Sequence, residues 1–205
     1  YYSSAYVGSA DSVSAWLPPM IVVDNAIPPP YAALVGDDAG NLVMIYTGDL
    51  DGNGVYSTHS SDSGLTWSKP VAIYLTSNPI LVPYTLRLSL GQDHQAHASW
   101  NVVTNTGGDV SLHYARFDFQ TSLWTAPVTL SERLALDADS FGPSFPALVD
   151  NGSEVIVMYN AGNPLPSQRA GLGRPVQVVS LSKDNGDTWQ PSAVPFIRLE
   201  GRSGE

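Results

Sequence analysis

Ser60-Ser61-Asp62-Ser63-Gly64-Leu65-Thr66-Trp67 and Ser182-Lys183-Asp184-Asn185-Gly186-Asp187-Thr188-Trp189 both fit the pattern S-x-D-x-G-x-T-W at every fixed position. Two weaker copies become visible once these two are aligned. One keeps Ser9, Asp11 and Trp16 in register but has Val13 in place of the glycine, and the other keeps Asp118 and Trp124 with one extra residue between them. The tryptophans of the four copies stand at positions 16, 67, 124 and 189, so the spacings are 51, 57 and 65 residues, and the fifth, Trp100, lies outside the pattern. This regular spacing indicates an internal repeat along the whole chain.

Each copy of the pattern is surrounded by similar β-rich segments. A proline and a short apolar run follow each tryptophan, as in Pro70–Tyr74, and an extended run precedes each aspartate, as in Val55–His59. Earlier still are two runs joined by a tight polar turn, as in Ala33–Val35 and Asn41–Tyr46. Short β-rich runs bounded by Gly, Asn and Asp are typical of antiparallel strands in hairpins. We therefore expect an all-β chain with four antiparallel strands in each repeat.

A four-stranded antiparallel sheet that repeats at this period predicts the blades of a β-propeller. The first repeat has only a third and a fourth strand, expected at Ala5–Ser9 and Pro19–Val23, so we expect a single partial propeller over 1–205 with about three and a half blades and an incomplete ring. Such an open arc exposes strand edges, and we expect the remainder of the propeller or another chain to complete the ring. The predicted units are the second half of a blade over 1–27, blades over 28–78, 79–134 and 135–197, and a tail over 198–205.

The composition argues against several classes of protein. Nine basic and 19 acidic residues give a net charge of −10, and only 14% of residues are charged, so a basic face for nucleic acid is not expected. No stretch reaches the roughly 18 to 20 apolar residues of a membrane span. The absence of cysteine excludes disulfides and thiolate zinc sites. Because lysine is limited to Lys69 and Lys183, we expect an exported protein, extracellular or on the cell surface, whose leader is not present in this chain.

The repeated pattern resembles the Asp box of the sialidase (neuraminidase) family, also called the bacterial neuraminidase repeat. In that family the box lies on the hairpin between the third and fourth strands of a blade, which is where the pattern falls here. The resemblance implies an exo-glycosidase that acts on terminal sialic acid or a related sugar. The alternative is a non-catalytic propeller that binds a glycan or a protein at its surface.

The residue types of the pattern explain a structural role in the turn. The aspartate can accept hydrogen bonds from backbone N–H groups of its own turn, the glycine supplies a positive φ, and the tryptophan can pack between sheets. The residues to which we assign this role are Asp11, Trp16, Ser60, Asp62, Gly64, Trp67, Asp118, Trp124, Ser182, Asp184, Gly186 and Trp189.

Catalytic residues are harder to assign than structural ones. The resemblance implies a centre with three arginines that hold a carboxylate, a tyrosine nucleophile assisted by a glutamate, and an aspartate acid/base. The Arg-Ile-Pro segment of the family does not occur in this chain, which favours the non-catalytic alternative, and we expect the chain alone to be inactive. Arg87, in an expected inner strand, is the candidate for a central arginine, and Asp139, before another inner strand, is the candidate acid/base. An ordinary strand arginine and a solvated turn are the respective alternatives.

Two tyrosines stand at comparable positions before expected inner strands. Tyr31 and Tyr84 each follow a proline, and they are candidates for substrate binding by stacking on a sugar. The alternative is that they fill the centre of the ring.

One loop has the spacing of a cation site. Asp49-Leu50-Asp51-Gly52-Asn53-Gly54 matches the first half of a calcium loop, with oxygen ligands at positions 1, 3 and 5. Position 12 is Ser60 instead of a bidentate glutamate, so a glycine-rich hairpin turn remains an alternative. We expect no required cofactor, with calcium at Asp49, Asp51 and Asn53 as the candidate ion.

Overall fold

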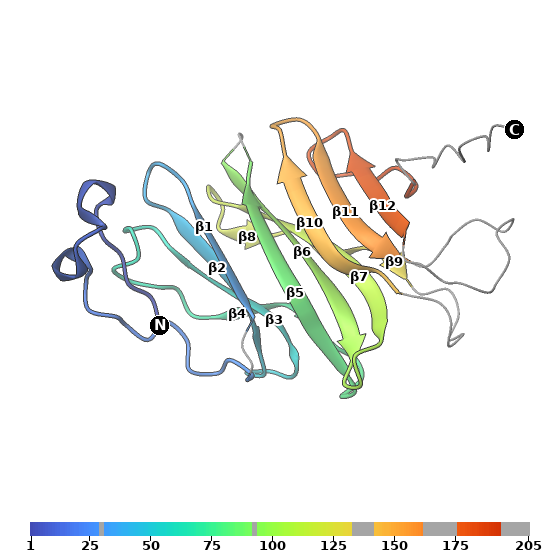
Figure 1. Cartoon of the computed structure of the whole chain (residues 1–205), viewed down its shortest axis with the longest axis horizontal. Helices are drawn as coiled ribbons and strands as arrows, with labels where there is room; N and C mark the ends of the chain where they lie inside the picture. Colours follow the sequence, from blue (N-terminus) through green and yellow to red (C-terminus); the bar gives the residue numbers. More distant parts are fainter. Residues whose placement is uncertain (29–30, 92–93, 133–141, 162–175, 194–205) are drawn as a thin grey trace, which may run out of the picture.

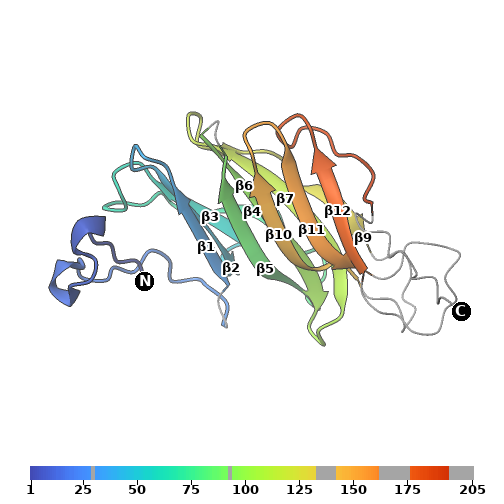
Figure 2. The same cartoon turned by 45° about the horizontal axis from the view of Figure 1, so that its top comes forward.

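The computed structural model of the protein describes residues 1–28, 31–91, 94–132, 142–161 and 176–193. Within these ranges the fold is all-β apart from two short 3₁₀ helices, Val7–Ser9 and Val13–Ala15, and no helix in them is long and apolar enough to cross a membrane. Three antiparallel sheets follow one another along the chain and lie side by side (Figures 1 and 2). The all-β prediction is confirmed for the described residues. Because the sheets form an open array, the number of blades in a closed ring stays a prediction.

The strands are paired in chain order within each sheet. Sheet 1 contains β1 (Ala32–Gly36), β2 (Leu42–Gly48), β3 (Gly54–Ser60) and β4 (Val71–Leu75). Sheet 2 contains β5 (Leu81–Leu90), β6 (Gln95–Thr104), β7 (Asp109–Asp118) and the two-residue β8 (Leu123–Trp124), with β9 (Val128–Glu132) also paired to β7. Sheet 3 contains β10 (Ser144–Asp150), β11 (Val155–Ala161) and β12 (Val176–Ser182). A fourth strand was expected in sheet 3. Among the described residues, the pairing at that place is a single bridge between Val179 and Ala193.

The fourth strands begin at a constant distance from the repeated tryptophans. In each copy of the pattern, the residue four positions after the tryptophan pairs with an earlier segment of the same unit. These pairs are Tyr2 with Met20, Ser57 with Val71, Tyr114 with Val128, and Val179 with Ala193. The N-terminal segment therefore shares the register of the three sheets, although its pairing is one isolated bridge.

The strands expected at Ala5–Ser9 and Pro19–Val23 are not formed, and this part of the prediction is wrong. Val7–Ser9 is a 3₁₀ helix, and Met20 pairs with Tyr2. Val13 stands where the complete pattern has a glycine, and the chain makes a second 3₁₀ turn there instead of a turn with positive φ. Asp11 makes none of the hydrogen bonds found at the complete copies within the described chain, and the Trp16 indole N–H donates to the Ala10 carbonyl oxygen (3.0 Å).

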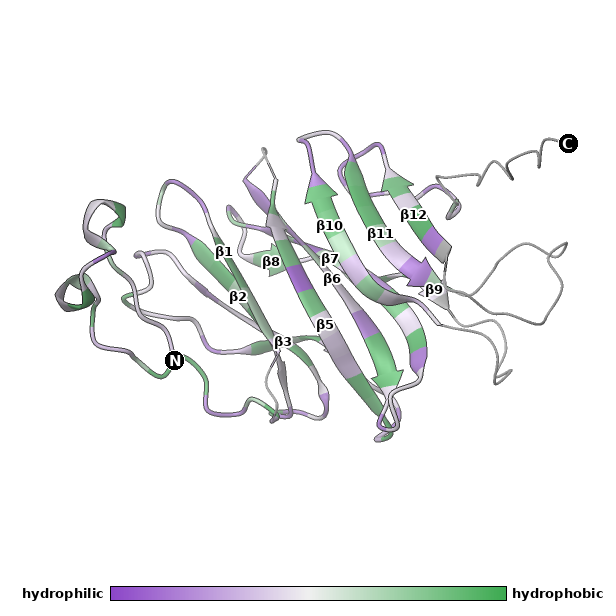
Figure 3. Cartoon of the chain, viewed as in Figure 1, coloured by the Kyte–Doolittle hydropathy of each residue, from purple (hydrophilic) through white to green (hydrophobic). Residues whose placement is uncertain are grey.

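The hydrophobic core lies between the sheets. Ile45 and Val55 of sheet 1 pack with Leu86 and Trp100 of sheet 2, and Leu112 of sheet 2 belongs to a second cluster. The other buried members of that cluster come from sheet 3 and are Val157, Tyr159 and Val178. Burial of one such side chain stabilises the fold by roughly 1.5 to 3 kcal/mol. Figure 3 shows hydrophobic residues along the strands and hydrophilic residues in many of the connecting hairpins.

The two complete copies of the pattern, called here the Asp62 turn (Ser60–Trp67) and the Asp184 turn (Ser182–Trp189), have the same hydrogen bonds. Asp62 accepts from the Ser60 hydroxyl (2.7 Å), the Thr66 N–H (2.8 Å) and the Thr66 hydroxyl (2.6 Å). In the Asp184 turn the corresponding donors are Ser182 and, through both groups, Thr188. In each turn these hydrogen bonds, those from the threonine first, lower the pKa of the aspartate to about 2.

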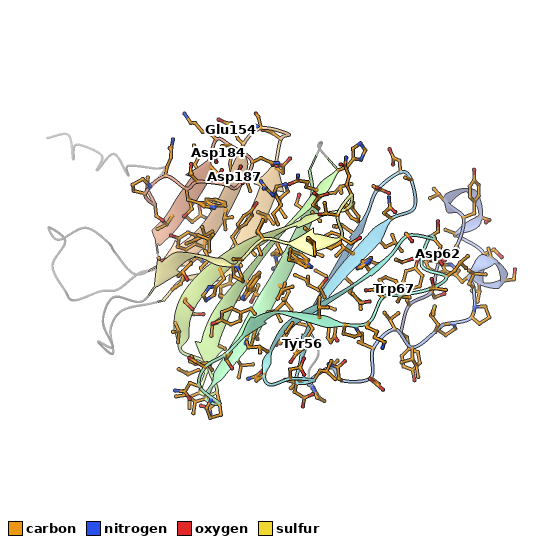
Figure 4. All side chains as sticks on the ribbon, turned by 180° about the vertical axis from the view of Figure 1, so that it is seen from behind. Tyr56, Asp62, Trp67, Glu154, Asp184 and Asp187 are labelled. Carbon is orange, nitrogen blue, oxygen red and sulfur yellow. The ribbon has the colours of Figure 1, made fainter. Side chains whose placement is uncertain are left out.

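The glycine of each turn lies directly under a tyrosine of a neighbouring segment. Gly64 has φ 87° and Gly186 has φ 90°, and a Cβ added at either position would collide with Tyr2 or Tyr114, respectively. Tyr2 also packs edge-on against Trp67 (ring centroids 5.4 Å apart), and Tyr114 packs in the same way against Trp189 (4.7 Å). We call this arrangement the ring-on-glycine contact. It joins the N-terminal segment to sheet 1 and sheet 2 to sheet 3. Figure 4 shows the aspartates of the two turns, Asp62 and Asp184, on opposite sides of the array.

The copy between Asp118 and Trp124 keeps part of this arrangement. Asp118 accepts a hydrogen bond from the Gln120 N–H (2.7 Å), and hydrogen bonds from the backbone lower its pKa. Ser122, with φ 57°, takes the positive φ that glycine takes elsewhere. The extra residue thus changes the loop while the aspartate still caps its own turn.

We predict that Gly186→Ala destabilises the protein by about 1 to 3 kcal/mol, because alanine at positive φ is strained and its Cβ displaces Tyr114. Gly107→Ala is the matched control, since Gly107 has φ 89° and open space around its Cβ position. Urea denaturation of both variants measures the difference. Equal losses of stability would show that the ring-on-glycine contact contributes nothing beyond the backbone strain.

The buried His113 predicts a loss of stability in mild acid. Burial lowers its pKa from 6.5 to about 4, so the unfolded chain binds a proton that the folded chain does not between these two values. The contribution of His113 to the free energy of unfolding is therefore fully present above pH 6.5. It decreases on acidification towards pH 4, by on the order of 3 kcal/mol. Urea denaturation from pH 7 to pH 4 measures the slope, which His113→Gln should reduce. An unchanged slope in that variant would contradict the assignment.

Candidate functional site

The first strands of the three sheets meet at one pocket of about 240 Å³. Strand β5 lies between β1 and β10 and contacts both (Figure 1), so residues far apart in the sequence become neighbours. Tyr31, directly before β1, contributes from the sheet 1 side, and Phe145 of β10 contributes from sheet 3. The full lining is Tyr31, Ala32, Tyr84, Thr85, Leu86, Arg87 and Phe145. Three of the four predicted sugar-site residues thus lie at the same pocket, while their roles stay predictions.

Tyr31 and Tyr84 form an edge-to-face pair at this pocket, with ring centroids 4.5 Å apart and an interplanar angle of 62°. The Tyr31 backbone N–H donates to the Thr47 hydroxyl (3.2 Å), which fixes the approach to β1. Hydrogen bonding with Tyr84 raises the pKa of Tyr31 above its usual value of 10.0. This hydrogen bond stabilises the protonated form of the Tyr31 phenol.

Arg87 is the cationic residue of the described lining. Its Nε donates to the Pro146 carbonyl oxygen of β10 (3.1 Å), and its Nη1 donates to the Leu86 carbonyl oxygen (3.1 Å). The equivalent register positions in β1 and β10 are Ala33 and Ala147, so the charge belongs to sheet 2 alone. An arginine has five N–H donors, and two of them bind backbone carbonyl groups of the described residues. The guanidinium is thus oriented by the backbone and retains further donors for a ligand.

The structure does not describe the predicted acid/base residue. Asp139 lies outside the described residues, and none of the described lining residues is acidic. Phe145 was not predicted from the sequence, although Pro143 and Pro146 on either side of it gave a signal. Proline in a strand is typical of a bulge or an edge.

The candidate calcium loop is a hairpin loop between β2 and β3. Asp49 and Asp51 are exposed, and the Tyr56 hydroxyl fixes the loop by accepting from the Asp51 N–H (2.7 Å) and donating to the Gly52 carbonyl oxygen (2.6 Å). The Asn53 amide donates to the Leu81 carbonyl oxygen of sheet 2 (2.7 Å). The part of the chain that the structure describes contains no group of three His, Cys, Asp or Glu residues that could hold a metal ion. Calcium at this loop stays a prediction.

A second cluster of polar side chains lies between sheets 2 and 3, away from the pocket. His97 Nδ1 lies 2.7 Å from the Tyr114 hydroxyl, and His97 Nε2 lies 3.4 Å from Asp150 Oδ2. The His97 and Asp150 side chains have no exposed surface. Since a substrate cannot reach this cluster, we interpret it as a structural link between the two sheets.

Comparisons with known proteins define the class of fold. No protein-family model and no curated protein matches the chain. The fold is similar to an ulvan lyase of polysaccharide lyase family 25, with a TM-score of 0.60 and 15% identity over 92% of this chain and 48% of that chain. A structure of such a lyase bound to -[GlcA(1-4)Rha3S]- gives a TM-score of 0.57 and 14% identity over 87% of this chain and 46% of that chain. The structure of the α-L-arabinofuranosidase Arb93A of Fusarium graminearum gives a TM-score of 0.45 and 16% identity over 76% of this chain and 46% of that chain.

The chain thus spans about half the length of these neighbouring structures. They are propeller-like enzymes that act on glycans, so the fold is of this propeller-like kind. At 14 to 15% identity, the likeness to the ulvan lyases concerns the fold alone. The finer resemblance to sialidases stays a prediction that rests on the repeated S-x-D-x-G-x-T-W pattern.

We predict that His97→Val destabilises the protein by about 3 kcal/mol, even though the equivalent position of sheet 1 is occupied by a valine, Val43. The reason is that the substitution leaves the Asp150 carboxylate buried without its partner. Adding Asp150→Asn should restore part of the stability, since it removes the buried charge. Denaturation of the single and double variants measures both effects. A single variant as stable as the wild type would show that the pair contributes nothing.

Proposed function

We propose that the protein is part of an exported carbohydrate-active propeller whose pocket binds an acidic sugar of a glycan, sialic acid or a related sugar. The observation that carries this proposal is the convergence of Arg87, Tyr31 and Tyr84 on one pocket. A guanidinium matches the planar carboxylate of a sugar acid and can bind it with two parallel hydrogen bonds. The tyrosine pair adds an aromatic wall and a hydroxyl donor, as ligand pockets commonly have.

The size and surroundings of the pocket fit this ligand class. A volume of about 240 Å³ is below the roughly 300 to 1,000 Å³ of pockets that enclose drug-sized ligands, which suits one sugar unit. The ulvan lyase neighbour is bound to a saccharide that contains glucuronic acid, and this supports an acidic glycan as the ligand. The scarcity of charged residues supports an extracellular or cell-surface location.

The enzyme and the non-catalytic binding module share this binding step and differ in turnover. In the exo-glycosidase, Arg87 holds the substrate carboxylate and Asp139 acts as the acid/base, with the remainder of the propeller or another chain completing the ring. The absence of the Arg-Ile-Pro segment from residues 1–205 favours the binding module for this chain. Hydrolysis of a fluorogenic sialoside distinguishes the two, and we expect none from residues 1–205 alone.

We predict that Arg87→Met weakens binding of an acidic saccharide at least about tenfold, because a charge-assisted hydrogen bond is lost. Calorimetric titration with 3′-sialyllactose and with trigalacturonic acid measures this, and lactose is the neutral comparison. Arg116→Met is the control variant, since Arg116 pairs with Asp187 (2.9 Å) away from the pocket. Wild-type protein that binds neither acidic saccharide more tightly than lactose would overturn the proposed function.

A further inference from the structure

Two of the three inner strands carry the same irregularity at the pocket. The register of β5 shifts between Tyr84 and Arg87, and that of β10 shifts between Ser144 and Ala147. The residue after Tyr84, Thr85, has φ 49°, and the residue after Ser144, Phe145, has φ 50°. Strand β1 pairs with β2 without a shift. The irregularity is therefore a bulge specific to the two strands that meet beside Arg87.

A positive φ is unfavourable for both residues at these bulges. Threonine is β-branched and phenylalanine is bulky, and such side chains rarely adopt the left-handed region. Strain of this kind persists where the surrounding structure enforces it, and bulges are common beside binding sites, where they redirect a side chain. The same backbone shape in two strands therefore calls for an explanation in terms of what each side chain reaches.

The two bulges place their side chains in different surroundings. Thr85 is buried, with 8% of its surface accessible, whereas Phe145 is 65% exposed. Both line the pocket, so the bulge of β10 brings a large apolar ring to the surface of the pocket. Because Phe145 keeps 65% of its surface accessible and lies at the pocket, its side chain is available to a ligand there.

The arginine of the pocket also holds the bulge that carries the ring. Arg87 Nε donates to the carbonyl oxygen of Pro146, the residue that follows Phe145 (3.1 Å). The proline ring fixes φ at this position, and the hydrogen bond ties the bulge of β10 to β5. Phe145 is thus held at a defined place beside the guanidinium.

We propose that Phe145 is the stacking face of the pocket and a specificity-determining residue, so that the pocket takes a sugar whose carboxylate lies at Arg87 while an apolar C–H face of the ring lies on Phe145. This proposal rests on the proposed function and adds the second wall of the site. Such a ligand must combine an acidic group with an apolar face. The pocket therefore discriminates against small inorganic and aliphatic anions, which would satisfy Arg87 alone.

Calorimetric titration with 3′-sialyllactose and trigalacturonic acid tests this with three substitutions at one position. Phe145→Gly removes the ring and accommodates a positive φ, Phe145→Ala removes the ring and keeps the strain, and Phe145→Tyr keeps the ring. We expect the glycine and alanine variants to bind the better of the two saccharides about tenfold more weakly, and the tyrosine variant to bind like the wild type. The glycine variant should melt above the alanine variant. Tyr6→Ala, which removes an exposed ring in the N-terminal segment, should leave the affinity unchanged.

The salt dependence of binding separates this role from a structural one. The contribution of Arg87 should fall at high sodium chloride because salt screens it, whereas the loss caused by Phe145→Gly should be the same at low and high salt. If the wild type binds a saccharide and Phe145→Gly binds it with the same affinity, the role of Phe145 is overturned and the proposed function stands. Absence of wild-type binding to both saccharides would instead overturn the proposed function, and this inference with it.

Discussion

The carboxylate at the centre of each complete turn determines the geometry on which neighbouring segments pack. Because Asp62 binds both the backbone N–H and the hydroxyl of Thr66, the residues between them close a tight loop, and Gly64 takes a positive φ. A residue without a Cβ then lies under the ring of Tyr2, with Trp67 beside it. The pairing of the next strand starts four residues after the tryptophan. One set of hydrogen bonds thus relates the turn, the register of the fourth strand and the contact with the neighbouring segment.

The pocket and the ring-on-glycine contacts involve different strands. The contact between sheets 2 and 3 joins β7 to the Asp184 turn, while at the pocket the first strands β1 and β10 both contact β5. Each sheet therefore contributes its own first strand to a common site. The structure combines a protonated tyrosine, an oriented guanidinium and an exposed phenyl ring, although no single sheet holds all three.

The repeat made a large part of this structure predictable. Tryptophan spacing and the polar turns indicated the order of the strands, and the positions of Tyr31, Tyr84 and Arg87 before or within expected inner strands made them candidates for a central site. The N-terminal segment was harder to predict because Val13 replaces the glycine, and the 3₁₀ turns that form instead have no repeat to identify them. The bulge at Phe145 leaves no periodic signal beyond its flanking prolines. Asp150, the partner of His97, is 53 positions away from it along the chain and cannot be paired from one sequence.

The open array has a consequence for how the molecule comes apart. Among the described residues, sheet 2 packs against both of the other sheets and most of β6 is buried, whereas sheets 1 and 3 each contact sheet 2 alone. Proteins built in this way behave as one-dimensional arrays, in which stability is a sum of unit terms and nearest-neighbour terms. Opening therefore proceeds from the two ends towards the middle, and the amide hydrogens of β6 exchange with solvent last. The pocket, which needs all three sheets, disassembles at the first of these steps, so ligand binding and the docking of the outer sheets are thermodynamically linked.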